Sequence, residues 1–440
     1  MRWLKSYQDV LLIVLIGFIL RVSLVGYLHL QGYTGDEREY ISLAAKLAQG
    51  QAFVDSNGEW STKAPLWPLL LSIIFRVFGD ELLVPHILGC FLGGLAIWLG
   101  FVLSLDLTGS RFVALIAAAF IAVYPGLVIY STLLQTESLY IVFVLASFIL
   151  LERQRKHPTL STGVLVGVMA GLATLTRAVF FGFFVFLIAA LAILYRKQPG
   201  SYAGSLSIAA VAWLIVLTPW TIRNCNIHGE LVPISSWGGM SMLLGNNPYS
   251  TGTWSSKPGF EEWFMLKAKE NNLDLTQSTE TERSAFGRKL AVEYVLSEPE
   301  NAAKLALKKF YMHGVYPISN TDSDTRLQAV CVAGDIVMYL FAGFGLILMG
   351  WRKEGFVPII LAMVFFTTMQ VLLHCEARYR LPLMPFAAIF AAGGVALFAD
   401  THRLRDFFNI RRNKILAASW AMFVSAVYSF TAWQFLEGNI

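Results

Sequence analysis

The chain has 440 residues, of which 56% are hydrophobic and only 14% are charged, and its mean hydropathy is +0.58. Soluble proteins carry about 25% charged residues, so this composition excludes an ordinary cytosolic enzyme and a disordered chain. The formal net charge of +5 is small and does not call for a nucleic-acid partner. The composition indicates an integral membrane protein surrounded by membrane lipids.

Long apolar runs recur along the whole chain. A helix needs roughly 20 apolar residues to cross a bilayer core of about 30 Å. We therefore expect an all-α polytopic membrane protein with about 11 transmembrane helices. The predicted spans are residues 10–30, 82–104, 111–130, 134–152, 160–176, 178–195, 203–222, 330–349, 355–373, 381–399 and 415–435.

Basic residues are distributed unevenly between the loops, or joins, that connect the predicted spans. The short joins around 125–137 and 374–380 hold only Arg378 and Arg380. Cytoplasmic loops carry an excess of Lys and Arg, so the N-terminus is predicted to be cytoplasmic and the C-terminus to lie outside. The basic residues of the predicted cytoplasmic joins are Arg111, Arg153, Arg155, Lys156, Arg196, Lys197, Arg352, Lys353, Arg403, Arg405, Arg411, Arg412 and Lys414.

Two segments face outward without spanning. In the first, the apolar run 65–79 is too short to cross and predicts a re-entrant or interfacial helix. The second begins with Gly-, Asn- and Pro-rich turns and continues as amphipathic helical runs at 282–296 and 301–311. The predicted parts are an N-terminal transmembrane module at 1–222 with the outer loop 31–80, a small, mainly helical outer domain at 223–328, and a C-terminal transmembrane module at 329–440.

An acidic pair, Asp36-Glu37, lies at a turn directly before an amphipathic helix in the first outer loop. Carboxylates favour a helix N-terminus, so a solvated helix start is one interpretation. The other is a general base, because a carboxylate at the membrane rim could take a proton from an attacking hydroxyl. No nucleotide-binding loop or zinc-protease motif occurs, which disfavours a nucleotide-driven pump and a zinc protease.

Several cations lie on the outer side, against the positive-inside bias: Lys63, Arg177, Arg223, Arg378 and Arg380. Long basic side chains at span ends often snorkel to the interface, which explains any one of them. Together they fit an anionic lipid headgroup better, because guanidinium and ammonium groups suit a phosphate or pyrophosphate leaving group.

Two more charges need partners. Glu137, at the outer start of the fourth span, is either a helix-start carboxylate or a group that orients an acceptor. Arg21 lies near the middle of the first span, where a charge costs at least about 2.5–3.5 kcal/mol. We expect it to form an ion pair or to hydrogen-bond to the first outer loop.

Three weaker patterns remain. Gly163, Gly167 and Gly171 have the spacing of helix packing. Cys225 and Cys331 bracket the outer segment and could pair in an oxidising compartment. His374 and Glu376 could ligate a divalent metal beside Asp36, but two ligands in a short loop are weak evidence, so we expect no cofactor.

In these motifs the chain resembles the GT-C superfamily of membrane glycosyltransferases, in the branch of the protein O-mannosyltransferases and the lipid A aminoarabinose transferase. The order of the motifs along most of the chain carries the resemblance. They are Asp36-Glu37 with Tyr40, Leu47-Ala48-x-Gly50, Lys63-Ala64-Pro65-Leu66, Phe78-Gly79, Thr136-Glu137, Thr176-Arg177, Pro219-Trp220-x-x-Arg223-Asn224, Gly245-Asn246-Asn247-Pro248 and Arg378-Tyr379-Arg380-Leu381-Pro382.

The resemblance implies a sugar donor on a polyprenyl phosphate and catalysis by Asp36. It places Lys63, Arg177 and Arg378 near the donor phosphate, and Glu137 at a second acidic position of such enzymes. Arg380 is assigned to the same phosphate, Glu37 to catalysis beside Asp36, and Tyr40, Arg223, Asn246, Asn247 and Tyr379 to substrate binding. Glu39 stands where aminoarabinose transferases carry Arg, so no phosphate role is carried over to that position. The aminoarabinose specificity is not carried over either, because the outer domain between Arg223 and Asp324 looks more like that of other bacterial members.

The predicted function is transfer of a sugar from this donor to a lipid, glycan or protein acceptor, with inversion, at the periplasmic face of an inner membrane. One alternative is a flippase or transporter of lipid-linked glycans, although transporters favour midplane charges and internal repeats. Another is an O-antigen ligase-like enzyme, which relies on outer-loop Arg and His.

Overall fold

The computed structural model describes residues 2–29, 35–196, 200–315, 325–349 and 354–436, and apart from one isolated bridge between Ser250 and Ser256 its regular structure there is helical. The helices of the first half are α1 (Arg2–His29), α2 (Gly35–Ala48), α3 (Leu66–Phe78), α4 (Leu83–Thr108), α5 (Arg111–Val123), α6 (Pro125–Thr132), α7 (Glu137–Lys156), α8 (Leu160–Thr176), α9 (Val179–Leu194) and α10 (Gly200–His228). Those of the second half are α11 (Gly238–Gly245), α12 (Phe260–Glu270), α13 (Glu280–Ser297), α14 (Pro299–Val315), α15 (Thr325–Met349), η1 (Glu354–Phe356), α16 (Val357–Leu372), η2 (Ala377–Leu383), α17 (Met384–Phe398), α18 (Thr401–Asn409) and α19 (Arg411–Leu436).

A helix forms at each of the eleven predicted runs, which confirms the all-α class. Within the described ranges, six helices are long and apolar enough to cross a membrane, or seven if α5 and α6 form one bent span. The helices α8 and α9 are apolar but have only 17 and 16 residues. Eleven crossings therefore remain a prediction.

The predicted span 111–130 is not one straight helix, because α5 and α6 meet at an angle of 55°. Proline disfavours the helical conformation in the residue before it and has no N–H to donate. Tyr124, which precedes Pro125, is extended, with φ −61° and ψ 119°. The break thus follows from the Tyr124-Pro125 sequence.

Arg21 bonds to this break rather than to the first outer loop, so that expectation was wrong. Its guanidinium donates to the carbonyls of Ala122 (2.9 Å) and Ile121 (3.2 Å) and to Gly17 O (2.9 Å). The last carbonyls of a helix lack partners within it. The end of α5 therefore supplies the acceptors that a buried guanidinium needs.

The predicted packing role of the glycine stripe is confirmed on α8. A Cβ at Gly163 would lie 2.7 Å from Ser205 O, and one at Gly167 only 2.2 Å from Ala209 O, both on α10. The missing side chains allow α8 and α10 to approach closely, as small residues do in membrane helix pairs.

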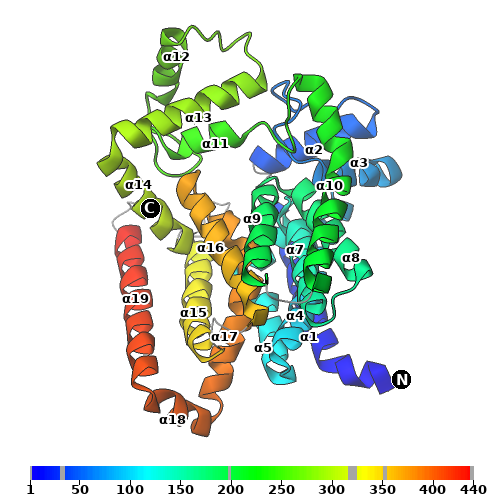
Figure 1. Cartoon of the computed structure of the whole chain (residues 1–440), viewed down its shortest axis with the longest axis vertical. Helices are drawn as coiled ribbons and strands as arrows, with labels where there is room; N and C mark the ends of the chain where they lie inside the picture. The colour runs from blue at the N-terminus through cyan, green and yellow to red at the C-terminus, as the bar shows by residue number, and fades with distance from the viewer. Residues whose placement is uncertain (1, 30–34, 197–199, 316–324, 350–353, 437–440) are drawn as a thin grey trace.

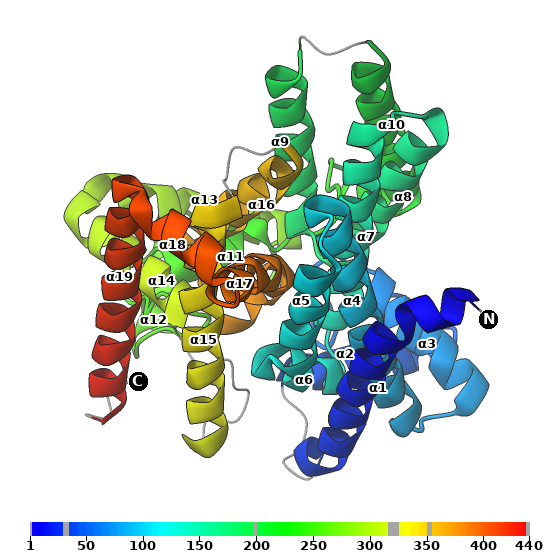
Figure 2. The same cartoon turned by 90° about the horizontal axis from the view of Figure 1, so that it is seen from below.

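The core lies around α17, whose residues from Phe386 to Ala392 are buried. This helix packs against α15 on one side and α5 on the other, and so joins the two groups of helices seen in Figure 2. All four cysteines are free thiols, so Cys225 and Cys331 do not pair.

The helices α2, α3, α11, α12 and α13 lie at one end of the molecule, whereas α18 lies at the other (Figure 1). The short helix predicted at 65–79 forms as α3, and Arg76 ties it to α2 by donating to Leu47 O at 2.7 Å. The amphipathic runs predicted at 282–296 and 301–311 form α13 and α14. The division into three parts remains a prediction, and α10 continues past its predicted boundary at residue 222 to His228.

Candidate functional site

The acidic pair begins α2, and Asp36 lies between two cations from distant parts of the chain. Its carboxylate is 3.4 Å from Lys63 Nζ, in the loop before α3, and forms a second ion pair with Arg378 on η2. Lys63 also pairs with Glu39 at 2.6 Å. Gln135 Oε1 accepts from Arg378 at 3.0 Å, so the turn between α6 and α7 holds this arginine in place.

These pairs fix the charge states. Burial alone would raise the pKa of Asp36, but Arg378 and Lys63 outweigh it and lower the pKa to about 2. Burial opposes the charge of Lys63 as well, yet Tyr40, Asp36 and Glu39 raise the pKa of the ammonium above its ordinary value. At neutral pH the site therefore holds an ionised carboxylate and an ionised lysine.

A second ion pair lies beside the first. Arg177, which ends α8, is 3.2 Å from the buried Glu137 carboxylate at the start of α7. The ring of Tyr379 lies 5.0 Å from the Arg177 guanidinium and 5.5 Å from that of Arg378. This aromatic ring links the two arginines by cation–π contacts.

A cavity of about 220 Å³ opens at this point. Its polar part includes Tyr40, Lys63, Arg177 and Tyr379. Its apolar part includes Phe366 and Met369 of α16 and Leu373, which directly follows this helix. Asp36 and Arg378 do not line it. They connect to it through Lys63 and Tyr379, and the Asp36 side chain keeps 28% of its surface exposed.

A chain of hydrogen bonds crosses one wall of the cavity. His374 is bonded through Nδ1 to Ser241 Oγ at 2.9 Å and through Nε2 to the Tyr379 hydroxyl at 3.0 Å. Burial lowers the pKa of His374 to about 4, so the imidazole is neutral at pH 7 and has one donor and one acceptor nitrogen. Ser241 stands in no motif that would have marked it, and Gln135 could have been noticed only as the neighbour of Thr136-Glu137.

Glu37 lies apart from the cavity. It is buried, and its carboxylate accepts from Leu134 N at 2.9 Å, while Trp67 donates its indole N–H to Leu134 O at 3.1 Å. This contact ties α2 to the turn between α6 and α7.

Arg380 is also removed from the cavity lining. It is fully buried, forms an ion pair with Asp335 on α15 and donates to His313 O at 3.2 Å. Arg378 and Arg380 thus point to different partners although only one residue separates them.

Arg223, Asn246 and Asn247 likewise bond to backbone outside the lining. Arg223 donates to Trp60 O at 3.0 Å, and the Asn246 and Asn247 amides donate to carbonyls of α11 at 2.9 and 2.8 Å. These residues shape the segments around the site.

His374 and Glu376 contact different partners. Glu376 accepts from Trp254 N at 3.0 Å, whereas His374 is engaged with Ser241 and Tyr379. Among the residues that the structure describes, no group of three His, Cys, Asp or Glu side chains could hold a metal ion.

One family model matches part of the chain. Residues 62–222 match that of the dolichyl-phosphate-mannose-protein mannosyltransferases, and this stretch contains Lys63, Glu137 and Arg177. Among curated proteins, none matches the chain.

Solved membrane enzymes share the fold. The chain is 13% identical to ArnT from Cupriavidus metallidurans bound to undecaprenyl phosphate, with a TM-score of 0.52 over 90% of this chain and 61% of that one. It is 16% identical to the oligosaccharyltransferase AglB from Archaeoglobus fulgidus in complex with an inhibitory peptide and a dolichol-phosphate, with a TM-score of 0.50 over 96% and 55%. A further structure of the Archaeoglobus fulgidus oligosaccharyltransferase, tethered with an acceptor peptide containing the NVT sequon, is 14% identical, with a TM-score of 0.54 over 97% and 54%.

The chain thus spans about three fifths or less of the length of these proteins. Such low identity shows the fold and not the substrates. The chain has the fold of the GT-C membrane glycosyltransferases, and residues 62–222 match the dolichyl-phosphate-mannose-protein mannosyltransferase family.

Proposed function

We propose that this protein is a membrane glycosyltransferase that moves a sugar from a polyprenyl-phosphate donor to an acceptor at the outer face of an inner membrane. The observation that carries the proposal is the Asp36 carboxylate held between Lys63 and Arg378 beside a cavity that also contains Arg177. The named relatives, which bind undecaprenyl phosphate or dolichol-phosphate, support a lipid-linked donor.

The cations fit a donor phosphate. Lys63 and Arg177 line the cavity, and Arg378 contacts it through Tyr379. A phosphate placed there would leave the apolar wall of α16 for the first part of the lipid chain. The cations would stabilise the negative charge that develops on the departing phosphate, which is usually the largest catalytic contribution.

Asp36 is the proposed base. It accepts the proton of an acceptor hydroxyl as the oxygen attacks the anomeric carbon, and the bond from that carbon to the phosphate oxygen breaks with its electron pair leaving on the phosphate. A single displacement of this kind inverts the anomeric configuration. Glu137 keeps Arg177 in place through their ion pair, and Glu37 anchors the helix that carries Asp36.

A charge exchange makes Asp36 available. Without donor, its carboxylate is ion-paired with both Lys63 and Arg378. An entering phosphate dianion or diester competes for both cations with charge-assisted hydrogen bonds. Asp36 then loses much of its stabilisation as an anion and becomes a better proton acceptor.

The test compares purified wild type with Asp36→Asn, using radiolabelled polyprenyl-phosphate sugars and a membrane lipid and glycan extract. We expect the variant to lose about 10²–10⁴-fold in transfer rate. Asp274→Asn, which changes an exposed carboxylate in the turn after α12, serves as the control and should be unaffected. Retained anomeric configuration in the product, or movement of the carrier lipid across vesicles by both proteins without any transfer, would refute the proposal.

A further inference from the structure

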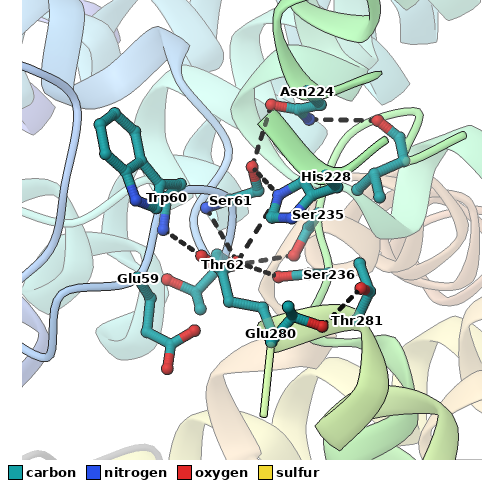
Figure 3. A network of polar contacts seen from close by, with 12 residues as sticks. Glu59, Trp60, Ser61, Thr62, Asn224, His228, Ser235, Ser236, Glu280 and Thr281 are labelled. Carbon is teal, nitrogen blue, oxygen red and sulfur yellow. Dashed lines mark hydrogen bonds and ion pairs between the residues drawn. The ribbon is translucent and has the colours of Figure 1, made fainter. Parts of the chain in front are cut away.

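The outer segment, which is the predicted outer domain beginning at residue 223, contacts the loop that carries Lys63 (Figure 3). Glu280, the first residue of α13, accepts hydrogen bonds from two consecutive backbone amides: that of Trp60 and that of Ser61, the latter at 3.1 Å. Ser236 Oγ donates to the same carboxylate at 2.7 Å. Three donors therefore converge on one carboxylate.

The carbonyls of this loop are bonded as fully as its amides. Ser61 O accepts from Ser236 N at 2.9 Å, and Thr62 O accepts from Ser235 Oγ at 2.8 Å. Trp60 O accepts from Arg223 at 3.0 Å. Five main-chain groups in three residues thus bond to the stretch from the end of α10 to the start of α13.

The Ser61 hydroxyl adds a further attachment. It donates to Asn224 Oδ1 at 3.0 Å and lies 2.9 Å from His228 Nε2, and both partners belong to the last turns of α10 (Figure 3). We call residues 60–62 with Arg223, Asn224, His228, Ser235, Ser236 and Glu280 the clasp.

A carboxylate suits the centre of the clasp. It is acceptor-only, so each of its oxygens can take an amide N–H, and charge-assisted bonds of this kind are about twice as strong as neutral ones. The N-terminus of a helix also favours an anion, and Glu280 lies in the first turn of α13. The Glu280 side chain is only 7% exposed, so loss of its charge would leave amide donors without equivalent partners.

Lys63 follows directly after the clasp. Its ammonium contacts Glu39 at 2.6 Å and Asp36 at 3.4 Å, and both carboxylates belong to α2. These contacts require a fixed distance between the Lys63 backbone and α2. The only residue between Lys63 and the amides bonded by Glu280 is Thr62, whose carbonyl the clasp also fixes. The docking of α13 therefore determines where the lysine side chain begins.

We propose that Glu280 is a positioning residue for Lys63, so that the affinity of the site for the donor phosphate depends on the docking of the outer segment. This inference rests on the proposed function for the identity of the ligand. Glu280 touches no reacting atom and acts only through the loop.

The first measurement is the binding of a polyprenyl phosphate to the full-length protein in detergent. Glu280→Gln keeps the size of the side chain but replaces one acceptor oxygen with a donor, and we expect about tenfold weaker binding. Glu282→Gln is the matched control, because Glu282 lies on the same turn and caps α13 at Thr279 without contacting the clasp. Equal weakening by both variants would overturn the proposal.

A double-mutant cycle separates positioning from general stability. In a Lys63→Ala background, Glu280→Gln should cause no further loss of phosphate binding, because the group that it positions is gone. The thermal midpoint of each variant is recorded in parallel. Additive losses in binding would show that Glu280 acts independently of Lys63 and would refute the inference.

A chemical readout keeps the test independent of catalysis. Acylation of lysines, followed by mass spectrometry, should show Lys63 labelled several-fold faster in Glu280→Gln than in wild type, with the exposed Lys289 as internal reference. If the protein transfers no sugar but Lys63 labelling rises, the proposed function fails and the clasp stands. If the labelling is unchanged, the clasp does not position Lys63.

Discussion

Asp36 on α2 forms an ion pair with Arg378 on η2, although one lies near the start of the chain and the other near its end. This contact connects α2 with η2, the segment that leads into α17. The proposed base, Asp36, therefore stays ion-paired with Arg378 until another anion replaces it as the partner of the arginine.

The pH dependence of transfer should reveal whether a bound phosphate replaces Asp36 as the partner of Lys63 and Arg378. In the free protein Arg378 and Lys63 lower the pKa of Asp36 to about 2, so kcat/KM should show no acid limb from Asp36 at pH 4 or above. A bound phosphate adds negative charge and takes up both cations, and each change raises the pKa of Asp36. Since kcat reports the donor complex, its acid limb should lie at higher pH than that of kcat/KM. Coincident limbs, measured by initial rates across pH, would contradict the exchange.

Arg378 and Arg380 should respond differently to the same substitution. Arg378→Gln removes a proposed phosphate ligand while Asp36 keeps Lys63, so we expect a folded protein with at least about tenfold weaker donor binding. Arg380→Gln leaves Asp335 buried without its partner, which costs about 3–5 kcal/mol of stability. Thermal unfolding in detergent and phosphate binding separate the two effects. Loss of folding in both variants would contradict the distinction.

Variants of the Arg177–Glu137 pair can separate a role of Arg177 in donor binding from a role in stability. Arg177→Met alone leaves a buried carboxylate unpaired and should destabilise the protein by about 3–5 kcal/mol. Adding Glu137→Leu removes that charge and should restore much of the thermal stability. Donor binding should stay weak in the double variant, because the proposed phosphate ligand is still absent. Recovery of both properties together would assign Arg177 a structural role alone.

The sequence predicted the helices well because apolar runs of membrane length are an unambiguous signal. The alternation of the predicted spans puts the loops of three cations on the same side as Asp36, and the resemblance groups these cations, Lys63, Arg177 and Arg378, at one phosphate. In the structure Lys63 and Arg378 pair with Asp36, and Arg177 lines the same cavity as Lys63. The break between α5 and α6 was missed, although the single residue Pro125 explains it.

The roles of individual polar residues were harder to predict. Arg380 follows Arg378 by two positions, and only the three-dimensional packing of α15 shows that it meets Asp335. Arg223 is a cation on the predicted outer side, as Lys63 is, yet it bonds to loop carbonyls. A sequence gives the type and side of a charge but not the neighbour that neutralises it.

The Gly245-Asn246-Asn247 motif leads to the last prediction, because its glycine is a point of close approach. A Cβ at Gly245 would lie 2.2 Å from Leu373 O, directly before His374. The buried Lys309 ammonium clamps this junction by donating to Gly245 O, Asn246 Oδ1 and Leu373 O, each at 3.0 Å. Although burial lowers the pKa of Lys309 to about 8, the ammonium is still mostly charged at pH 7.

Gly245→Ala should therefore push the chain that leads to His374, Arg378 and Tyr379 away from α11. We expect a lower thermal midpoint together with weaker binding of a polyprenyl phosphate, since the arginine and the tyrosine beside the cavity move with the displaced backbone. Gly238→Ala is the matched control, because a Cβ there has open space around it. A Gly245→Ala protein that unfolds at the wild-type temperature and binds phosphate normally would show that the contact between α11 and the end of α16 does not position the site.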